Sequence, residues 1–383
     1  MTRPELLILS FSSIDGDARV LKQVRLFRER YAVTTCGYGP APEGVARHIR
    51  IPDDRSASEL AGRLITLRWY RRAYWSVPAV RWAREALGGL SFDAVLANDL
   101  EAVPVAVRLA GGARVHADLH EYTPRLHEEH EAWNRRIRPF HEWVARRYAS
   151  RAASWTTVSG GLAREYERRF GFLPRIVTNA APYADLRPTP VADPIRIVHS
   201  GACLKNRNIL AMVDGVIAAA RPVTLDLYLT PNDPGYLEEI RQRALGSAGP
   251  DGVQRVVLHD PVPYSDLVRT LNEHDLGIHV LPPVNFNNEW ALPNKLFDYV
   301  QARLGVVVGP SSEMAHYVRT HDLGVVADDF TAEALTRVLD GLDRDLVAQY
   351  KSSADGAAEA MSAEAQVHVW AECVDRIVDG RVA

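Results

Sequence analysis

Short apolar runs alternate along the chain with longer segments in which apolar residues recur at helical spacing. In the first half, the runs predict strands near residues 6–11, 32–36, 94–97, 114–118, 155–158 and 175–177. The segments between them predict helices over residues 17–30, 58–87, 101–110, 133–150 and 159–170. Strands that alternate with helices form parallel sheets, and those helices cover the sheets. The first half is therefore predicted to be an α/β domain.

The stretch from residue 179 to 194 has four prolines and no periodicity, which indicates an extended linker. A second series then predicts strands near residues 195–199, 225–229, 255–258, 276–281, 305–308 and 324–326. Helices are predicted near residues 209–219, 236–244, 265–272, 294–302, 313–320 and 332–339, and the chain from 346 to 378 has a helical pattern without a strand.

The pattern therefore predicts an α/β protein with two Rossmann-like, doubly wound domains. We expect the first domain over residues 1–185 and the second over 186–361, with a C-terminal helix over about 362–383 that packs back on the first. In such folds ligands bind at the carboxyl ends of the strands, so we expect the site in a central cleft between the two sheets.

Composition agrees with a folded globular protein, because 47% of the 383 residues are hydrophobic and 24% are charged. The three cysteines are far apart and odd in number, which fits reduced thiols. No apolar run approaches the roughly 18 residues that a membrane span requires. We expect a cytoplasmic protein that at most lies on the inner face of the membrane.

The net charge of −3 is unevenly distributed. Residues 1–190 carry 29 Lys+Arg against 21 Asp+Glu, whereas the remainder carries 16 against 27. A basic first half and an acidic second half predict separate partners for the two domains, and the negative total gives no reason to expect nucleic acid as a partner.

Two of the four lysines lie in predicted strand-to-helix loops of the second domain. In the first loop, Gly201 allows close backbone approach, Lys205 and Arg207 offer cations to a diphosphate, and Asn208 can cap the next helix. In the second, Lys295 falls in the first turn of a helix, where it opposes the helix dipole unless an anion is bound. The alternatives are a capped helix with solvated cations in the first loop and a Lys295–Asp298 pair in the second.

The segment Leu292-Pro293-Asn294-Lys295-Leu296-Phe297-Asp298-Tyr299, with the runs 305–308 and 324–326, resembles the nucleotide-sugar segment of GT-B glycosyltransferases, family 4 in particular. Further similar segments are Asp17-Ala18-Arg19-Val20, Ala97-Asn98-Asp99-Leu100, Asp118-Leu119-His120-Glu121-Tyr122, Val158-Ser159-Gly160-Gly161-Leu162, Thr178-Asn179-Ala180 and Arg207-Asn208. The resemblance covers essentially the whole chain.

The resemblance implies that the second domain holds the donor and the first the acceptor. The implied donor-binding residues are Gly201, Lys205, Arg207, Asn208, Val262, Glu289, Asn294, Lys295 and Asp298. By the same resemblance, Asp298 accepts hydrogen bonds from ribose hydroxyls, and the loop 259–264 lines the base. The implied catalytic residues are His120, Glu121 and Asp99, and the N-terminal loop contributes Ser13 and Gly16. Trp290 stands where the family commonly carries the first glutamate of a pair, and the adjoining Glu289 is the candidate to replace it.

The expected activity is transfer of a sugar, with retention of configuration, from a nucleotide-diphosphate sugar such as a UDP- or GDP-sugar to an acceptor hydroxyl. The acceptor is a sugar, a lipid-linked molecule or a small metabolite, and neither a metal nor a separate cofactor is expected. A nucleotide-sugar epimerase and a non-catalytic sugar-nucleotide-binding protein remain alternatives, because fold alone does not decide chemistry. A dinucleotide dehydrogenase is disfavoured because no Gly-x-Gly-x-x-Gly follows any predicted strand.

Two further clusters attract attention. One region contains five histidines, which could form a zinc site or be solvated or core histidines: His116, His120, His127, His130 and His141. His120 differs from the others because it directly follows the end of a predicted strand. The segment 63–87 interleaves arginines with aromatic residues: Arg68, Arg71, Arg72, Arg81 and Arg84 with Trp69, Tyr70, Tyr74, Trp75 and Trp82. This pattern suits binding to a membrane interface or to a lipid-linked acceptor. The alternative is an amphipathic helix whose aromatic residues pack inward.

Overall fold

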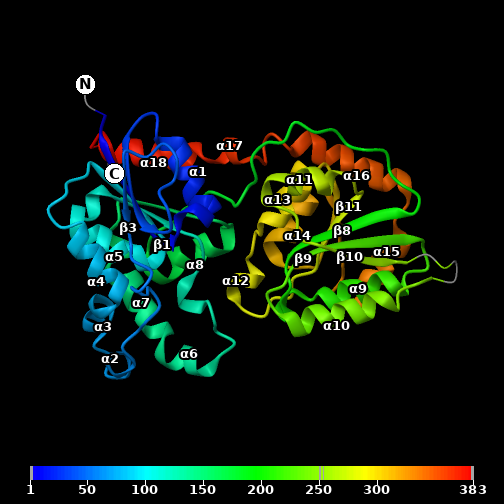
Figure 1. The fold of residues 1–383 in the computed structure, drawn as a ribbon, viewed down its shortest axis with the longest axis horizontal. Coiled ribbons are helices and arrows are strands. Elements are labelled where there is room, and N and C mark those ends of the chain that lie inside the picture. The colour runs from blue at the N-terminus through cyan, green and yellow to red at the C-terminus, as the bar shows by residue number, and fades with distance from the viewer. Residues whose placement is uncertain (1–2, 250–251, 253, 381–383) are drawn as a thin grey trace. The chain divides into compact units, whose positions relative to one another are not determined.

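The computed structural model describes residues 3–249, 252 and 254–380 (Figure 1). Contacts within the chain divide it into two compact units. Unit 1 comprises the chain up to Thr178, the short segment Asn285–Asn287 and the C-terminal segment that begins at Gln366. Unit 2 comprises Asn179–Val284 and Asn288–Ala365. This division and the predicted boundary at residue 185 both fall next to or within the proline-rich stretch 179–194.

Unit 1 contains a sheet of seven parallel strands in the order β3-β2-β1-β4-β5-β6-β7. The strands are β1 (Glu5–Ser13), β2 (Ala32–Tyr38), β3 (Arg47–Arg50), β4 (Ala94–Asn98), β5 (Val115–Leu119), β6 (Ser154–Thr157) and β7 (Arg175–Ile176). Every residue of β4 and β5 is buried, as expected of central strands that helices cover on both faces. The strand order reverses between β1 and β4, and this switch point is where open α/β sheets bind ligands.

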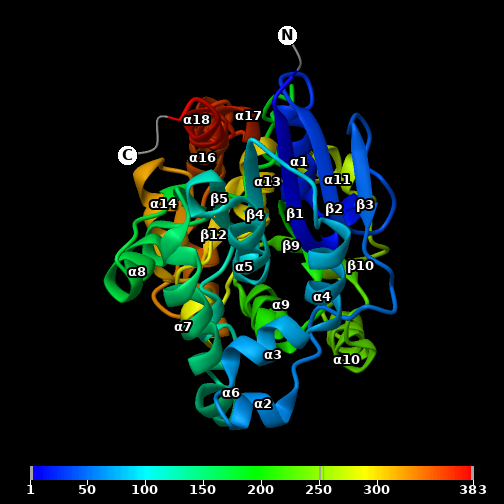
Figure 2. The ribbon, with the colours of Figure 1, turned by 90° about the vertical axis from the view of Figure 1, so that its left-hand side faces the viewer.

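The helices of unit 1 are α1 (Ala18–Phe27), α2 (Gly62–Thr66), α3 (Tyr70–Ser76), α4 (Pro78–Ala86), α5 (Asp99–Ala110), α6 (Glu131–Arg136), α7 (Arg138–Arg147), α8 (Gly160–Phe170) and the C-terminal α18 (His368–Val378). Helices α1 and α18 share a core with β1 and β4, in which Phe27 and Trp370 are almost fully buried (Figure 2). Helix α5 packs against β4 and β5, so its first residue lies at the carboxyl edge of the sheet.

Unit 2 contains a sheet of six parallel strands in the order β10-β9-β8-β11-β12-β13. The strands are β8 (Ile195–Ala202), β9 (Val223–Thr230), β10 (Val256–His259), β11 (Leu276–His279), β12 (Gly305–Val308) and β13 (Gly324–Val326). Its helices are α9 (Ile209–Ala218), α10 (Pro234–Leu245), α11 (Tyr264–Asn272), α13 (Asn294–Gln301), α14 (Ser312–Thr320), α15 (Ala332–Gly341) and α16 (Arg344–Ala357), and the short α12 (Phe286–Glu289) and α17 (Ala363–Gln366) lie at transitions between the units.

The structure corrects two predicted helices and adds one strand. The helix predicted over residues 58–87 is three helices, because Arg68 adopts a left-handed φ of 56° and Pro78 starts a new helix after extended Val77. The helix predicted over residues 133–150 breaks between α6 and α7, where Pro139 lies in the first turn of α7. The unpredicted β3 is a short, largely charged edge strand, and such strands lack the apolar alternation that reveals a strand.

In the described part of the chain, no helix is both long and apolar enough to cross a membrane.

Candidate functional site

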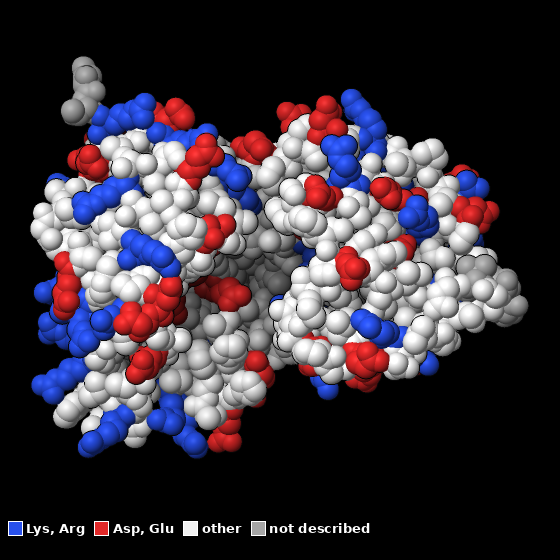
Figure 3. All heavy atoms as spheres, viewed as in Figure 1, with Lys and Arg blue, Asp and Glu red and all other residues white. Residues whose placement is uncertain are grey.

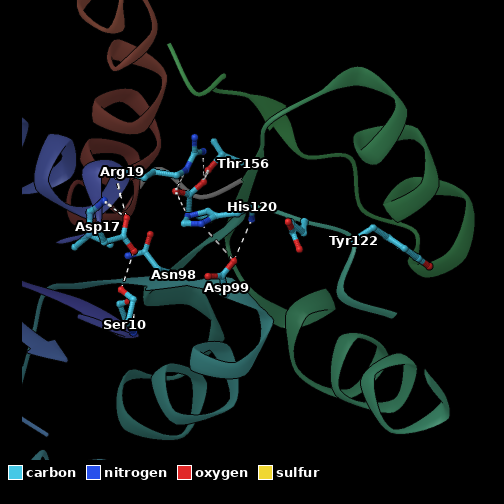
Figure 4. A network of polar contacts seen from close by, with 12 residues as sticks. Ser10, Asp17, Arg19, Asn98, Asp99, His120, Tyr122 and Thr156 are labelled. Carbon is cyan, nitrogen blue, oxygen red and sulfur yellow. Dashed lines mark hydrogen bonds and ion pairs between the residues drawn. The ribbon is translucent and has the colours of Figure 1, made fainter. Parts of the chain in front are cut away.

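The carboxyl ends of β4 and β5 lie side by side in unit 1 and carry a polar cluster (Figure 4). Asn98 ends β4 and is the register partner of Asp118 on β5. Asp99, the next residue after Asn98, and His120, two residues after Asp118, lie at the same edge. The cluster therefore arises from parallel strands that end together at the switch point of the sheet.

Asp118 is completely buried and fully partnered. Arg19 of α1 donates to both carboxylate oxygens, with Nε–Oδ2 and Nη2–Oδ1 distances of 2.8 and 2.7 Å. Gln23 and Thr156 each donate a further hydrogen bond of 2.7 Å. Burial opposes the charge, but Arg19 and His120 outweigh burial and hold the pKa of Asp118 well below its usual value. Asp118 is therefore a permanent buried anion at neutral pH.

His120 lies between two carboxylates. Its Nε2 is 3.4 Å from Oδ2 of Asp118, and its Nδ1 is 3.5 Å from Oδ1 of Asp99. Burial lowers the pKa of His120, but the two acids more than offset this and leave the pKa above its usual value. The imidazole remains 20% exposed, so it can both hold a proton and reach a bound molecule.

Asp99 is the strained member of the cluster. As the first residue of α5 it adopts a φ of 64°, a conformation that L-residues rarely adopt and that costs about 1–2 kcal/mol. Its carboxylate is still 40% exposed, yet the protein packed around it raises the pKa to about 6, against the opposing effect of His120. Asp99 and His120 therefore form a close pair in which the pKa of each group is raised above its usual value.

The other residues predicted for unit 1, Glu121, Ser13 and Gly16, are exposed. The Glu121 side chain is exposed, while its carbonyl accepts a 2.7 Å hydrogen bond from the Tyr166 hydroxyl. Ser13, the exposed last residue of β1, donates to Asp15 at 2.7 Å, and Gly16 lies at the exposed end of the short 3-10 turn that follows. Of the two predicted catalytic carboxylates, Asp99 is the one that lies against the imidazole of His120, at 3.5 Å.

In unit 2, the two predicted phosphate loops meet through Gly201 and Lys295. Gly201 is at the end of β8 with a φ of 130°, and a Cβ at this position would lie 2.5 Å from Nζ of Lys295. Only glycine satisfies both the backbone conformation and the close approach of the ammonium group. Two residues that are 94 positions apart in the sequence thus form one site.

The ammonium of Lys295 has no hydrogen-bond or ion-pair partner among the described residues, although Lys295 is largely enclosed by protein. Burial lowers its pKa to about 8, Arg207 lowers it further, and Asp298 only partly compensates. The alternative of an ion pair between Lys295 and Asp298 is therefore not realised. A desolvated cation next to a second cation is unfavourable by itself and becomes favourable when an anion binds.

Two buried histidines lie behind this cation and were not predicted from the sequence. His199 on β8 and His279 on β11 stack with ring centroids 5.6 Å apart. His199 pairs its Nδ1 with the carbonyl of Ile278 at 2.7 Å, while its Nε2 and the Nδ1 of His279 have no partner in the described structure. Burial, followed by the charge of Lys295, lowers the pKa of His199 to about 3 and that of His279 well below its usual value. Both rings are therefore neutral, and they add no positive charge to the site.

The remaining predicted donor residues fall into three environments. Lys205 and Asn294 are exposed, and Val262 is half-buried. Asn208 precedes α9 with a left-handed φ of 58°, but its side chain does not cap the helix as predicted, since its Nδ2 donates to the carbonyl of Phe330 at 2.8 Å. Asp298 is buried with the Tyr264 hydroxyl 3.4 Å from its Oδ1, and Glu289 accepts a hydrogen bond from Ser312.

Among the described residues, no group of three or more histidines, cysteines or acids could hold a metal ion. His116 is instead enclosed between Ser154 and Thr156, at 2.8 and 2.9 Å, and burial lowers its pKa to about 4. His141 is also buried, while His127 and His130 are 49% and 70% exposed.

No protein-family model matches the chain, and no curated protein matches its sequence. Solved structures match over almost its whole length. Anabaena HepE, in complex with UDP and glucose, has a TM-score of 0.69 at 15% identity, covering 97% of this chain and 100% of HepE. The α,α-trehalose 6-phosphate synthase of Burkholderia multivorans has a TM-score of 0.68 at 9% identity, covering 100% of both chains. A glycosyltransferase of Rickettsia africae has a TM-score of 0.68 at 11% identity, covering 99% of both.

The chain has the GT-B fold. The predicted fold class, an α/β protein with two parallel sheets, is confirmed. Membership of family 4 is not shown by these likenesses and stays a prediction.

Within this GT-B fold, several buried polar atoms that have no hydrogen-bond partner in the described part of the chain lie at or near the carboxyl ends of strands. Near strand ends they belong to Thr157, Ser159 and Thr178 in unit 1 and to His199, His279 and Ser311 in unit 2. The Nε2 of His120 makes no hydrogen bond with a described residue but lies 3.4 Å from Asp118, and the remaining atoms lie elsewhere, on Arg55, Trp133, Asn134 and Arg221. Buried polar groups are normally hydrogen-bonded, so a concentration of exceptions at one edge of each sheet indicates groups that bind ligand or ordered water. A polar ligand is therefore expected at the carboxyl edge of each GT-B domain.

Proposed function

We propose that this chain is a glycosyltransferase that takes a sugar from a nucleoside-diphosphate sugar and attaches it, with retention of configuration, to an acceptor hydroxyl. The observation that carries the proposal is the unpartnered ammonium of Lys295, held against Gly201 and beside Arg207. A diphosphate supplies an anionic partner for the Lys295 ammonium. The resemblance to family 4 supports retention and the use of a nucleotide donor.

The nucleoside part of the donor fits the neighbouring residues. The buried carboxylate of Asp298 can accept hydrogen bonds from ribose hydroxyls, and the partly exposed Tyr264 lies beside it. A UDP-sugar is the first donor to test, because the structurally similar HepE has been solved with UDP-glucose.

The proposed transfer breaks the bond between the anomeric carbon and the diphosphate oxygen and forms a bond from that carbon to the acceptor oxygen. The leaving diphosphate takes the proton of the acceptor hydroxyl, while Lys295, Arg207 and Lys205 stabilise its developing charge. In unit 1, His120 and Asp99 are proposed to act on the transferred sugar or the acceptor, because their side chains lie 3.5 Å apart, both are partly exposed, and the pKa of each is raised.

Calorimetric titration with UDP, GDP and ADP tests the donor half of the proposal, and UDP release from UDP-glucose with a panel of acceptors tests the transfer half. We expect one diphosphate to bind more tightly than its monophosphate by at least about tenfold, which corresponds to about 1.4 kcal/mol. Absence of binding by every nucleoside diphosphate would contradict the proposal.

One observation favours a binding protein without turnover. Trp290 replaces the first carboxylate of the family pair, and Glu289 beside it is already engaged by Ser312. A binding protein would hold UDP-glucose without slow hydrolysis, whereas a transferase releases UDP faster when its acceptor is added. An epimerase would change the sugar without needing an acceptor, so the acceptor dependence of UDP release separates the three functions.

A further inference from the structure

The hairpin formed by α2 and α3 exposes large apolar side chains at its tip. Leu67 and Trp69 are 54% and 50% exposed, and they flank Arg68, whose left-handed backbone turns the chain from one helix into the other. Figures 1 and 2 both place this hairpin at one end of unit 1, next to α6. An exposed tryptophan beside an exposed leucine at a protruding turn is suited to insertion into an apolar phase.

The sequence of the same hairpin carries positive charge and no acidic residue. Between Arg63 and Arg84 there are six arginines and no aspartate or glutamate. Arg63, Arg68, Arg71 and Arg72 are all exposed, and none of them forms an ion pair with a described residue. In Figure 3, several Lys and Arg spheres lie at the end of unit 1 where Figure 1 places α2 and α3. We call Arg63, Leu67, Arg68, Trp69, Arg71 and Arg72 the basic-apolar tip.

The tip is firmly attached to the helix that begins with Asp99. The hydroxyl of Tyr74 in α3 donates to the carbonyl of Glu101 in α5 at 2.6 Å. Tyr70 packs edge-on against Phe140 of α7, with ring centroids 5.8 Å apart. Arg136 of α6 donates to the hydroxyl of Thr66 at 3.2 Å. Most aromatics of the segment therefore pack inward as the amphipathic alternative predicts, while Trp69 does not.

We propose that the basic-apolar tip docks unit 1 on the surface of an anionic lipid bilayer. The arginines attract the negative headgroups, and Leu67 and Trp69 enter the interface between headgroups and acyl chains. The attachment through Tyr74 and Glu101 holds the start of α5, and with it Asp99 and His120, near that surface. This inference adds a partner to the proposed function and does not depend on the donor nucleotide.

The first test measures co-sedimentation with vesicles of phosphatidylcholine mixed with phosphatidylglycerol, using pure phosphatidylcholine as the reference. We expect the protein to bind the anionic vesicles at low salt and to be released at high salt, because surface charges are screened. The variant R63E/R71E/R72E should bind at least about 100-fold more weakly, since each basic residue near the surface contributes about fivefold.

The matched control is R187E/R269E/R319E, which changes the net charge equally at exposed arginines of unit 2. This control should keep most of the vesicle binding. Equal weakening of both variants would show only a net-charge effect and would overturn the proposal. Binding to single-stranded RNA without binding to vesicles would also overturn it, in favour of a nucleic-acid partner.

The second test locates the apolar part of the tip. Brominated phosphatidylcholine in the anionic vesicles should quench tryptophan fluorescence, and Trp69→Phe should remove most of that quenching while keeping the apolar character of the tip. Quenching unchanged in Trp69→Phe would overturn insertion of the tip. Calorimetry with UDP should give the same affinity for all these variants, so a failure of the membrane proposal is distinguishable from a failure of the proposed nucleotide binding.

Discussion

The two sheets end in polar clusters of opposite character. At the edge of β5 in unit 1, the buried charge of Asp118 is matched by Arg19 and by further donors, and Asp118 in turn holds His120. At the edge of β8 in unit 2, Lys295 forms no ion pair with a described residue, Asp298 only partly compensates for its desolvation, and His199 and His279 are neutral.

The difference separates stability from binding. A matched buried ion pair becomes strongly destabilising only when one partner is lost, whereas an unmatched buried cation already costs free energy in the ligand-free protein. The cluster of unit 1 is therefore expected to maintain the fold and position His120, and the cluster of unit 2 to bind an anion at the expense of stability. The following predictions test this contrast, from the largest expected effect to the smallest.

Asp118→Asn should destabilise the protein by about 3–5 kcal/mol, because it leaves the guanidinium of Arg19 buried without a counter-charge. Urea unfolding followed by circular dichroism measures the loss. Asp53→Asn is the control, since Asp53 pairs with Arg50 while 73% exposed and should change stability by less than about 1 kcal/mol. Equal effects of the two substitutions would show that the cluster is not a stability element.

His120→Ala should reduce turnover by about 10²–10⁴-fold, as expected for a positioned proton-transfer group, and leave UDP affinity within about twofold. The measurement compares kcat at saturating donor with calorimetric binding of UDP. His127→Ala removes a half-exposed histidine of the same unit and should change neither quantity. Normal turnover in His120→Ala would reduce His120 to a structural role and leave Asp99 and Glu121 as candidates.

Lys295→Met should weaken UDP binding by about 10–100-fold, because it removes a charge-assisted contact of about 1.5–3 kcal/mol. The same substitution should leave the ligand-free protein at least as stable as the wild type, since a desolvated charge is removed. Lys205→Met, at an exposed position, should cause a smaller loss of affinity. Unchanged affinity in both variants would refute the phosphate site.

Gly201→Ala should cost about 1–2 kcal/mol of stability through its positive φ and weaken UDP binding several-fold by displacing Lys295. Gly356→Ala is the matched control, because its Cβ meets nothing within 4 Å inside α16. That substitution should stabilise the protein by up to about 1 kcal/mol. Thermal unfolding and calorimetry on both variants decide whether the close approach of glycine and lysine matters for binding.

The affinity for UDP should fall as pH rises through about 8, where the free Lys295 loses its proton. A bound diphosphate raises this pKa, so binding takes up a proton above pH 8 and weakens by at most about tenfold per pH unit. The stability of the ligand-free protein should change with pH in the opposite direction. Between pH 8 and 10.5 Lys295 is protonated in the unfolded chain but not in the folded protein, so the free energy of unfolding rises with pH in this range.

Lys295→Arg keeps the charge at every accessible pH and should abolish the decline in affinity. Calorimetry in buffers of different ionisation enthalpy counts the protons taken up. An identical pH profile in the wild type and Lys295→Arg would assign the titration to another group.

The strands of both sheets were predictable because buried parallel strands are short apolar runs, a local property of the sequence. In the long helix predicted over 58–87, the break before Pro78 carried a local signal, because proline does not continue a helix, whereas the left-handed turn at Arg68 carried none. The edge strand β3 was not predicted, because a strand that pairs on one side only needs little apolar surface and therefore lacks the apolar run that reveals a buried strand.

By itself, the sequence determined two α/β halves, loops with unusual lysines and a histidine at a strand end. Only the tertiary structure decided which of these residues meet: Asp99 rather than Glu121 against His120, Lys295 against Gly201 rather than paired with Asp298, and His199 stacked on His279. Local patterns report which surface a segment buries, whereas desolvation and charge pairing depend on neighbours distant in the chain. No sequence motif could therefore predict the lowered pKa of Lys295 or the left-handed backbone of Asp99.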